Sequence, residues 1–196
     1  AEYTVNNDCD GNAIYYTNTS FTTTPQASID SCLWDMHDLG QFVNSNSGST
    51  NIGFIYNNFG IKTESLIVGD NFGCFSLPFS ITPPVQVYTN PSIVNLTADT
   101  ICDNTPTTFE FNRYYGSDTN LTYAWDYGDL QISDSSNSPH QHEYIVCNTY
   151  SVSLTVEDGN TCQDNSTTNA IVRCNPLADF WVENECINDS VEFVNQ

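Results

Sequence analysis

Short runs in which apolar and polar residues alternate follow one another along the whole chain, separated by stretches rich in Asp, Asn, Ser, Thr and Pro. The clearest run lies at 150–156, and shorter ones lie at 109–111, 121–125 and 170–172. Successive side chains of a strand point to opposite faces, so each run predicts a strand with one buried face. No segment repeats its apolar residues with helical periodicity. The pattern therefore predicts an all-β chain.

Turn-forming residues mark where these strands end. The stretches 103–106, 133–139 and 158–160 combine Asp, Asn, Ser, Pro and Gly, which favour tight turns. About seven short strands at this spacing are typical of a sandwich of two sheets. The composition agrees with a packed core, because 39% of the residues are hydrophobic and 13% are aromatic.

The chain repeats itself after roughly 90 residues, and such a period indicates a tandem array of similar units. Residues 34–38 (WDMHD) return at 125–129 (WDYGD), and residues 65–74 (SLIVGDNFGC) return at 153–162 (SLTVEDGNTC). The period drifts slightly along the repeat, as it would if loops of different length joined a fixed set of strands. Two such repeats cover most of the sequence.

A third repeat begins near the end of the sequence. Ala178 precedes Cys186 by the same spacing that separates Ala1 from Cys9. Pro and Asn interrupt the strand patterns between successive repeats. We therefore predict one unit over residues 1–88, a second over 89–176 and the start of a third, incomplete unit over 177–196.

The second repeat resembles the PKD (polycystic kidney disease) domain. WDYGD at 125–129 is followed by Pro139 with His142 and Tyr144, and then by YSVSLTVED at 150–158, which is the order of motifs in that family. The opening Ala-Asp-Phe … Cys element at 178–186 and the closing Asp-x-x-Gly-Cys element at 70–74 resemble those of PKD arrays in secreted cell-surface proteins of Bacteroidota. The resemblance implies tandem immunoglobulin-like β-sandwiches of the PKD type, without a catalytic centre.

The shared motif has a structural explanation. A Trp between two sheets buries roughly 150–250 Å² of surface. The Asp that follows it can accept backbone N–H bonds in the next turn, where Gly supplies a positive φ. The first repeat departs from the pattern, since His37 replaces this Gly and Phe54 stands where the motif His is expected. The residues expected to build the motif are Trp34, Asp35, Trp125, Asp126, Gly128, Asp129, His142 and Tyr144.

The charge balance excludes two classes of partner. Three Lys and Arg residues against 24 Asp and Glu residues give a formal net charge of −21. Nucleic acids and anionic lipid surfaces are bound through clusters of basic side chains, so neither is expected as a partner. No run approaches about 18 apolar residues, so no membrane span is predicted.

Eight cysteines without the paired CxxC spacing of a zinc site indicate disulfides. Disulfides persist in oxidising compartments, so we expect an extracellular or cell-surface location. Cys9 and Cys74 recur in register as Cys102 and Cys162. This register predicts the bonds Cys9–Cys74 and Cys102–Cys162, each within one repeat.

The remaining cysteines are not shared between the first two repeats. Cys147 and Cys174 fall opposite each other if the strands on either side of residues 159–163 form a hairpin, which predicts a cross-strand disulfide. Cys186 is expected to pair with the rest of the third repeat. Cys32 is expected either to be buried and inert or to pair outside this sequence.

Calcium is the metal that the composition favours, because it binds oxygen ligands and the predicted turns are rich in Asp and Asn. No EF-hand spacing occurs, and a solvated acidic surface is the alternative interpretation. No other cofactor is expected. The candidate calcium donors near the ends of the repeats are Asp70, Asn71, Asp158 and Asn160.

No catalytic residues are predicted. The acidic residues of the Trp-Asp motif recur at equivalent positions, which favours a role in turns over a glycosidase-like acid pair. No Gly-x-Ser-x-Gly motif occurs, and no His has a convincing Ser or Cys partner. His140 and His142 would share one face of a strand and could bind a metal. The resemblance implies instead that His142 packs and forms hydrogen bonds within the fold.

These features predict a structural or binding segment of a large secreted cell-surface adhesin or extracellular fibre. The expected partners are further repeats of the same chain, other copies within fibres, and a surface protein or glycan. Tyr114, Tyr115 and Tyr127 could offer a stacking platform for sugars, although ordinary packing is the favoured role of such residues. The alternative function is that of an accessory, non-catalytic region of a secreted protease or glycosidase.

Overall fold

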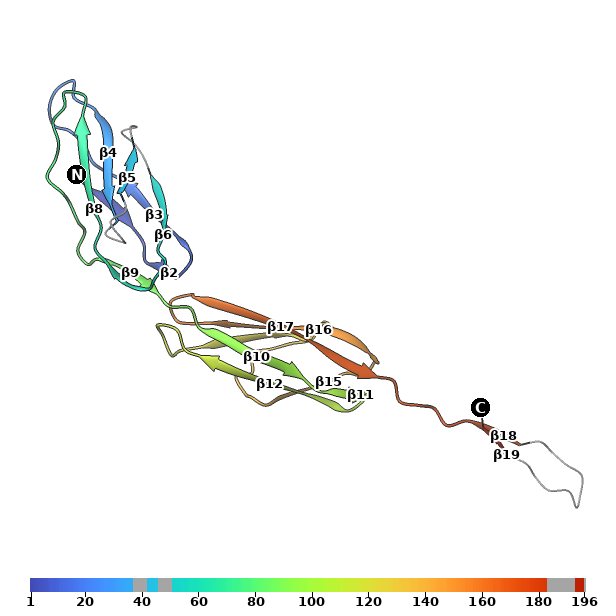
Figure 1. Ribbon diagram of the computed structural model, residues 1–196. Helices are drawn as coiled ribbons and strands as arrows, with labels where there is room; N and C mark the ends of the chain where they lie inside the picture. The colour runs from blue at the N-terminus through green and yellow to red at the C-terminus, as the bar shows by residue number, and fades with distance from the viewer. Residues whose placement is uncertain (37–41, 46–50, 183–192, 196) are drawn as a thin grey trace, which may run out of the picture.

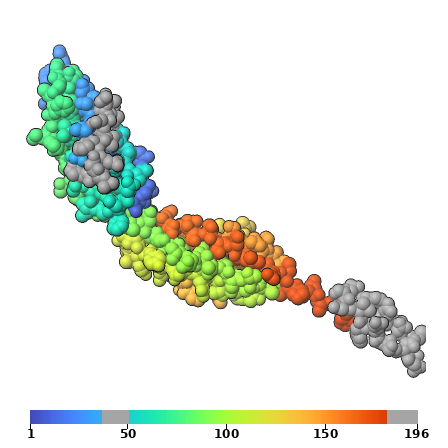
Figure 2. Space-filling model, in the orientation of Figure 1, coloured from blue at the N-terminus to red at the C-terminus, as the bar shows by residue number. Residues whose placement is uncertain are grey.

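The computed structural model describes residues 1–36, 42–45, 51–182 and 193–195. Two β-sandwiches lie end to end and are followed by a hairpin at the C-terminal end (Figure 1). The space-filling view shows the elongated outline of these two bodies and the narrow contact between them (Figure 2). We call residues 1–88 unit one and residues 89–176 unit two. His37, Asp38 and Cys186 lie outside the described residues.

Unit one is built from short strands in three small sheets, ordered β1-β3-β6, β5-β4-β8 and β2-β9-β7. The strands are β1 (Tyr3–Val5), β2 (Asp8–Cys9), β3 (Ala13–Asn18), β4 (Ile29–Asp35), β5 (Phe42–Ser45), β6 (Ile52–Ile55), β7 (Gly60–Lys62), β8 (Ser65–Asp70) and β9 (Val85–Tyr88).

Unit two has longer strands in two facing sheets, ordered β10-β12-β15 and β11-β17-β16-β13-β14. The strands are β10 (Ser92–Ala98), β11 (Thr100–Cys102), β12 (Pro106–Tyr114), β13 (Thr122–Asp126), β14 (Ile132–Ser133), β15 (His140–Glu143), β16 (Asn148–Glu157) and β17 (Gln163–Arg173). All the regular elements of the described residues are strands, so the prediction of an all-β sandwich fold is confirmed.

Aromatic side chains fill the core of unit one. Tyr3, Tyr16 and Trp34 are at most 3% exposed, and the Trp34 ring centroid lies 5.1 Å from that of Tyr3 and 5.6 Å from that of Tyr16. The hydroxyls of Tyr16 and Tyr56 lie 2.7 Å apart, so the polar ends of two buried rings satisfy each other. Burial raises the pKa of the Tyr16 hydroxyl, which therefore stays protonated.

Trp125 occupies the corresponding place in unit two. It is 1% exposed, and its ring centroid lies 5.5 Å from that of Phe109 and 5.7 Å from that of Phe111. Its indole Nε1 donates a hydrogen bond of 2.9 Å to the backbone oxygen of Ser135. The alternating residues of β12 and β13 thus face each other across the sandwich, as their pattern predicts.

The Trp strands pair in the same register in both units. Trp34 of β4 lies opposite Leu66 of β8, and Trp125 of β13 lies opposite Leu154 of β16. Both pairs are antiparallel, and all four side chains are buried. The sequence register over these strands therefore coincides with the structural register.

The hairpin of β18 (Phe180–Val182) and β19 (Phe193–Asn195) has the pairing of the first strands of unit one. Phe180 lies opposite Asn195, as Tyr3 lies opposite Asn18 in the β1–β3 pair. Within the described residues there is no helix long and apolar enough to cross a membrane.

Candidate functional site

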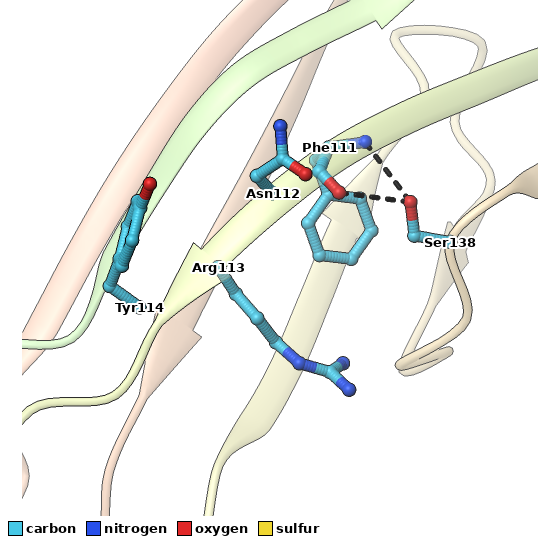
Figure 3. Close-up of a pocket in the computed structure, with 5 residues that line it drawn as sticks. All are labelled: Phe111, Asn112, Arg113, Tyr114 and Ser138. Carbon is cyan, nitrogen blue, oxygen red and sulfur yellow. Dashed lines mark hydrogen bonds between the residues drawn. The ribbon is translucent and has the colours of Figure 1, made fainter.

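A pocket at the end of β12 is lined by Phe111, Asn112, Arg113, Tyr114 and Ser138 (Figure 3). The Ser138 Oγ donates to the Phe111 backbone oxygen at 3.0 Å and accepts from the Phe111 N–H at 3.1 Å. Arg113 Nη1 donates to Tyr123 Oη and to the Ser136 backbone oxygen, both at 3.0 Å. These groups hold the end of β12 to the loop before β15 and to β13. The pocket therefore presents neither an activated nucleophile nor an acid–base pair.

The Trp-Asp turn of unit two has the geometry that its residue types favour. Asp126 Oδ1 accepts the Gly128 N–H at 2.9 Å, and Gly128 has a φ of +75°. A Cβ at Gly128 would come within 2.6 Å of the Ser151 backbone oxygen. The position therefore requires glycine both for its positive φ and for this close approach. In unit one, Trp34 is buried and Asp35 ends β4.

Asp129 and the motif histidine close the other side of this turn. Asp129 Oδ1 accepts the Gln131 N–H at 3.0 Å, and its Oδ2 lies 2.7 Å from His142 Nε2. The His142 ring stacks on Tyr127 with centroids 3.9 Å apart, and Tyr144 donates its hydroxyl hydrogen to the Tyr127 backbone oxygen at 3.0 Å. The Asp129 carboxylate thus holds the turn and the His142 ring together.

His140 is held separately from His142. Its Nε2 forms a hydrogen bond with the Tyr127 hydroxyl, and burial, together with the nearby His142, lowers the pKa of its imidazole. The imidazoles of both histidines therefore form hydrogen bonds inside unit two, His140 with Tyr127 and His142 with Asp129. Within the described residues, no three His, Cys, Asp or Glu side chains gather as metal ligands would.

The aromatic platform suggested by the sequence is reduced to two side chains. Tyr114 is 63% exposed and Tyr115 is 53% exposed, but Tyr127 is only 2% exposed. Tyr127 belongs to the stack with His142 and does not join Tyr114 and Tyr115 on the surface.

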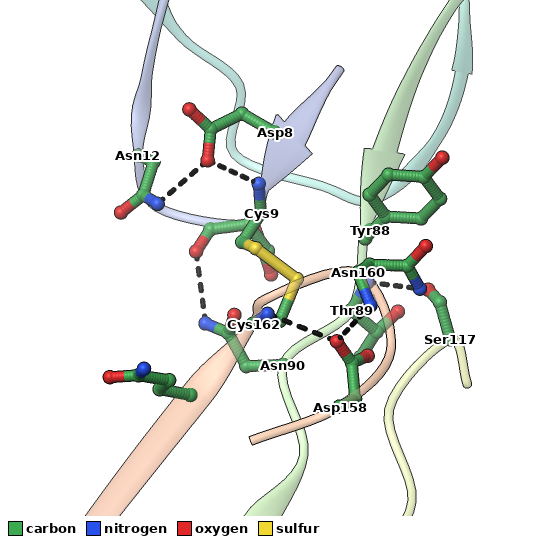
Figure 4. The surroundings of a disulfide bond; sticks show 12 residues. Asp8, Cys9, Asn12, Tyr88, Thr89, Asn90, Ser117, Asp158, Asn160 and Cys162 are labelled. Carbon is green, nitrogen blue, oxygen red and sulfur yellow. Dashed lines mark hydrogen bonds between the residues drawn. A yellow bond between two sulfur atoms is a disulfide. The ribbon is translucent and has the colours of Figure 1, made fainter. Parts of the chain in front are cut away.

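The junction between the two sandwiches holds the most specific chemistry of the molecule. A disulfide joins Cys9, at the end of β2, to Cys162, in the turn between β16 and β17, with a Cα–Cα distance of 5.6 Å (Figure 4). β9 ends at Tyr88 and β10 begins at Ser92, so a short peptide link crosses the same junction. Two covalent connections therefore join the units.

The observed bond corrects the predicted pairs Cys9–Cys74 and Cys102–Cys162. β17 runs for 11 residues from beside Cys162 to Arg173, which pairs with Cys102. At about 3.3 Å per residue, the two thiols stand about 35 Å apart, whereas a disulfide needs Cα atoms within about 7 Å. Cys102 is exposed and unpaired at the far end of unit two.

Unit one separates its two cysteines in the same way. β2 and β9 lie at the end of unit one that faces unit two, whereas β8 runs toward the opposite end (Figure 1). Cys74 follows β8 and is an exposed, unpaired thiol. The register of the repeat correctly matched equivalent cysteines, but it did not say which end of the sandwich each one occupies.

The predicted bond Cys147–Cys174 is present in the structure, with a Cα–Cα distance of 4.8 Å. It lies beside the Asn148–Val172 pair of β16 and β17, where the hairpin argument placed it. Cys32 is 2% exposed, and it accepts a hydrogen bond of 3.2 Å from Asn18 Nδ2. Burial was one of the two alternatives that the sequence left open for Cys32.

A single carboxylate shapes the turn that presents Cys162. Asp158 Oδ1 accepts the N–H groups of Asn160 at 2.8 Å and of Cys162 at 3.0 Å. The Asp158 N–H donates to the Cys162 backbone oxygen at 2.9 Å. Asp158 is 4% exposed, so this carboxylate is an internal part of the junction.

The predicted calcium donors are divided between two distant turns. Asp158 and Asn160 belong to the junction, whereas Asp70 ends β8 and Asn71 follows it, at the opposite end of unit one. Asn71 Oδ1 accepts the Ser28 N–H at 2.9 Å, which ties its turn to the neighbouring loop. The four residues therefore do not form one ligand cluster.

Backbone contacts complete the junction. The Thr89 N–H donates to Ser117 Oγ at 2.7 Å, and the Ser117 N–H donates to the Thr89 backbone oxygen at 3.0 Å. Asn90 Nδ2 donates to the backbone oxygen of Asp10 at 3.0 Å. A Cβ at Gly116 would come within 2.1 Å of the Thr89 backbone oxygen, so only glycine allows this approach.

Comparison with protein families supports the fold of unit two. Residues 88–172 match the family model of the PKD domain. The matched segment begins at the last residue of β9 and ends within β17, so it coincides with unit two. The PKD match and the two disulfides fit a secreted protein. No curated protein sequence matches the chain.

Solved structures that are similar to this chain have low sequence identity and TM-scores of 0.40 or less. The fibronectin(III)-like modules of Clostridium thermocellum CbhA are 13% identical with a TM-score of 0.40, covering 88% of this chain and 95% of theirs. Three N-terminal domains of the bacteriophage RB49 Highly Immunogenic Outer Capsid protein (Hoc) are 11% identical with a TM-score of 0.38, covering 100% and 69%. Dimeric latent PorU from Porphyromonas gingivalis is 12% identical with a TM-score of 0.30, covering 89% and 20%.

Proposed function

We propose that this chain is a stiff structural segment of a secreted cell-surface adhesin or extracellular fibre built from PKD-like units. The observation that carries the proposal is the Cys9–Cys162 bond, which joins the two sandwiches beside the short link at 89–91. A short peptide link alone can act as a hinge between domains. A second covalent connection at the same junction restricts bending and twisting about that link.

The junction bond also couples the stability of the two units. It joins residues 153 positions apart. Closing a loop of this length stabilises the folded state by about 5 kcal/mol through loop-closure entropy. Because the loop contains strands of both units, the bond restricts the unfolded chain of both. Such coupling suits a segment that must keep its length under load.

The test compares the solution shape of the wild-type chain with that of the double variant Cys9→Ser/Cys162→Ser. We expect small-angle scattering of the variant to give a broader distribution of interatomic distances, because the units can then bend about 89–91. The matched control is Cys147→Ser/Cys174→Ser, which removes a disulfide within unit two and leaves the junction intact. Identical profiles for the wild type and the junction variant would contradict the proposal.

A further unit after Asn175 is part of the proposal. Support comes from the β18–β19 hairpin, whose pairing repeats that of β1 and β3, and which lies next to no other strand of the described residues. Isolated two-stranded hairpins are only marginally stable in water. We propose that such a hairpin completes a sandwich with strands of its own unit or contacts a neighbouring molecule.

Deletion of residues 177–196 tests the role of this segment in assembly. If the hairpin mediates contacts between molecules, the shortened chain sediments with a smaller weight-average mass than the intact chain at equal concentration. Unchanged association would remove this segment from the assembly contacts.

The chain itself is proposed to be non-catalytic. The hydroxyl of Ser138 and the carboxylates of Asp126 and Asp129 are engaged in hydrogen bonds that hold loops and turns. We expect no turnover of casein or of a panel of polysaccharides by the purified chain. Measurable hydrolysis would overturn this part of the proposal. A catalytic domain found next to these units would favour the accessory role in a secreted hydrolase.

A further inference from the structure

The turn that carries the unpaired Cys74 is a copy of the turn that carries Cys162. Asp70 Oδ1 accepts the N–H groups of Phe72 at 3.0 Å and of Cys74 at 2.9 Å, and the Asp70 N–H donates to the Cys74 backbone oxygen at 3.0 Å. Asp158 makes the same three hydrogen bonds around Cys162. In one copy the cysteine is bonded to the neighbouring unit, and in the other it is an exposed thiol.

The unpaired Cys102 occupies the same kind of position as Cys9. Cys9 ends the short strand β2, which pairs in parallel with β9 and places Cys9 opposite Tyr88. Cys102 ends the short strand β11, which pairs in parallel with β17 and places Cys102 opposite Arg173. Both cysteines therefore lie beside the last strand of their unit, where the chain leaves for the next element.

The residues that follow these cysteines repeat the same contacts. The Asp10 N–H donates to the Tyr88 backbone oxygen at 2.7 Å, and Asn90 Nδ2 donates to the Asp10 backbone oxygen at 3.0 Å. In unit two, the Asp103 N–H donates to the Arg173 backbone oxygen at 2.8 Å. Asn175 Nδ2 then donates to the Asp103 backbone oxygen at 3.0 Å. The exit of the chain from unit two is thus organised like its exit from unit one.

The two exposed thiols lie at opposite ends of the molecule. Cys74 follows β8 at the end of unit one that points away from unit two, and Cys102 is the last residue of β11, at the end of unit two nearest the β18–β19 hairpin (Figure 1). They are too far apart to pair with each other. Each lies at the end of its unit where an adjoining unit would lie.

We propose that Cys74 and Cys102 are halves of further disulfides between units, each a repetition of the Cys9–Cys162 bond. Cys102 bonds the turn cysteine of the unit that begins with β18 and β19. Cys74 bonds the strand-end cysteine of a unit before Tyr3. This inference rests on the proposed function, because it requires adjoining units of the same kind.

The chemistry of each bond is ordinary thiol–disulfide exchange. The thiolate of one cysteine attacks a small-molecule or protein disulfide, which forms a mixed disulfide and releases one thiolate. The second cysteine then displaces the other half of the reagent. When each new S–S bond forms, the two cysteine thiols lose two protons and two electrons in total, and the disulfide oxidant is reduced to two thiols.

The test is a disulfide map of the protein as its cells secrete it. Thiols are first blocked by alkylation, and the unreduced protein is then cleaved at Asp and Glu, because three Lys and Arg residues leave trypsin few sites. We expect the Cys102 and Cys74 peptides to carry no alkyl group and to be linked to cysteine peptides from outside residues 1–196. Reduction should release both pairs.

The bonds Cys9–Cys162 and Cys147–Cys174 provide the internal control, because they must be recovered intact. Alkylated Cys74 and Cys102 in a sample with both control bonds would overturn the inference. So would a link from Cys102 to a separate copy of the chain, or a secreted protein without adjoining units. If Cys74 and Cys102 are free thiols, but scattering shows that Cys9→Ser/Cys162→Ser makes the chain more flexible, the proposed function stands and this inference fails.

Discussion

At the scale of single residues, one carboxylate decides how the junction cysteine is presented. Asp158 accepts two backbone N–H groups with one oxygen atom, and it is buried while it does so. Asp70 makes the same hydrogen bonds at the free end of unit one, where its side chain is only partly buried. Substitutions at Asp158 and Asp70 can therefore be compared to measure how much burial at the junction adds to the stability of the same turn.

We expect Asp158→Ala to lower the free energy of unfolding of the oxidised chain by about 2 kcal/mol, because the buried N–H of Cys162 and the partly buried N–H of Asn160 lose their acceptor. Asp158→Asn keeps an acceptor oxygen and should lose less. Urea unfolding provides the measurement, and Asp70→Ala is the control, with a smaller expected loss. A loss from Asp158→Ala no greater than that from Asp70→Ala would show that burial at the junction adds nothing.

A second prediction at this scale concerns pH. The pKa of His140 lies below its ordinary value of 6.5, because burial disfavours the charged ring and His142 is close by. The unfolded chain therefore takes up a proton near pH 6.5 that the folded chain takes up only at lower pH, so this group contributes stability above that pH and loses it below. Once His140 is protonated, its Nε2 can only donate in the hydrogen bond with the Tyr127 hydroxyl.

We expect the wild type to lose more stability between pH 7.5 and pH 5 than His140→Gln does. Urea unfolding of both proteins at the two pH values measures this difference, and carboxylates elsewhere cancel in the comparison. An equal loss of stability in the two proteins would mean that His140 does not change its protonation state between pH 7.5 and pH 5.

At the scale of elements, the sequence predicts the long strands well and the shortest ones not at all. The run at 150–156 lies within β16, since alternation of apolar side chains is a local signal. β2 and β11 have two and three residues, which is too few to show any period. They exist because they pair in parallel with β9 and β17. Since these strands carry Cys9 and Cys102, the sequence could not tell where those thiols lie.

The motif residues and the hairpin disulfide were predictable for a related reason. The Asp126–Gly128 turn depends on neighbours in sequence, and Cys147 meets Cys174 through one hairpin. The Cys9–Cys162 bond depends on how two units stack, which no local pattern contains. Counting the direction of successive strands would have placed Cys74 and Cys9 at opposite ends of unit one.

We expect Cys147→Ala/Cys174→Ala to destabilise unit two by about 3.5 kcal/mol, because the bond closes a loop with a sequence separation of 27. Calorimetry of the intact chain should show that the effect is larger in unit two than in unit one. The folded variant should give the same small-angle scattering profile as the wild type, because the junction between the units is unchanged. A selective loss in unit one would contradict the assignment of this bond to the hairpin.

At the scale of the whole molecule, the net charge of −21 acts on every part of an elongated body. Like charges repel one another, and dissolved salt screens this repulsion over about 10 Å at 0.1 M. The candidate calcium donors lie in two separate turns, and a calcium ion takes about six to eight oxygen ligands. We therefore expect cations to stabilise the chain mainly by screening.

The melting temperature should rise with ionic strength, and calcium and magnesium should raise it equally when ionic strength is matched. Thermal unfolding in chelator, in millimolar calcium and in millimolar magnesium measures this. A rise specific to calcium would reveal a site of its own, and Asp70→Asn and Asp158→Asn would then show which turn holds it.

The distance along the chain between Cys9 and Cys162 has a consequence for the order of events during secretion. If the chain emerges from its N-terminus, Cys9 reaches an oxidising solution well before its partner, which follows 153 residues later. Cys32 and Cys74 emerge after Cys9 but before Cys162, and they are the nearest wrong partners along the chain. Folding of unit one buries Cys32 and carries Cys74 to the far end of the sandwich. Early folding of unit one therefore keeps Cys9 from pairing with Cys32 or Cys74 before Cys162 has emerged.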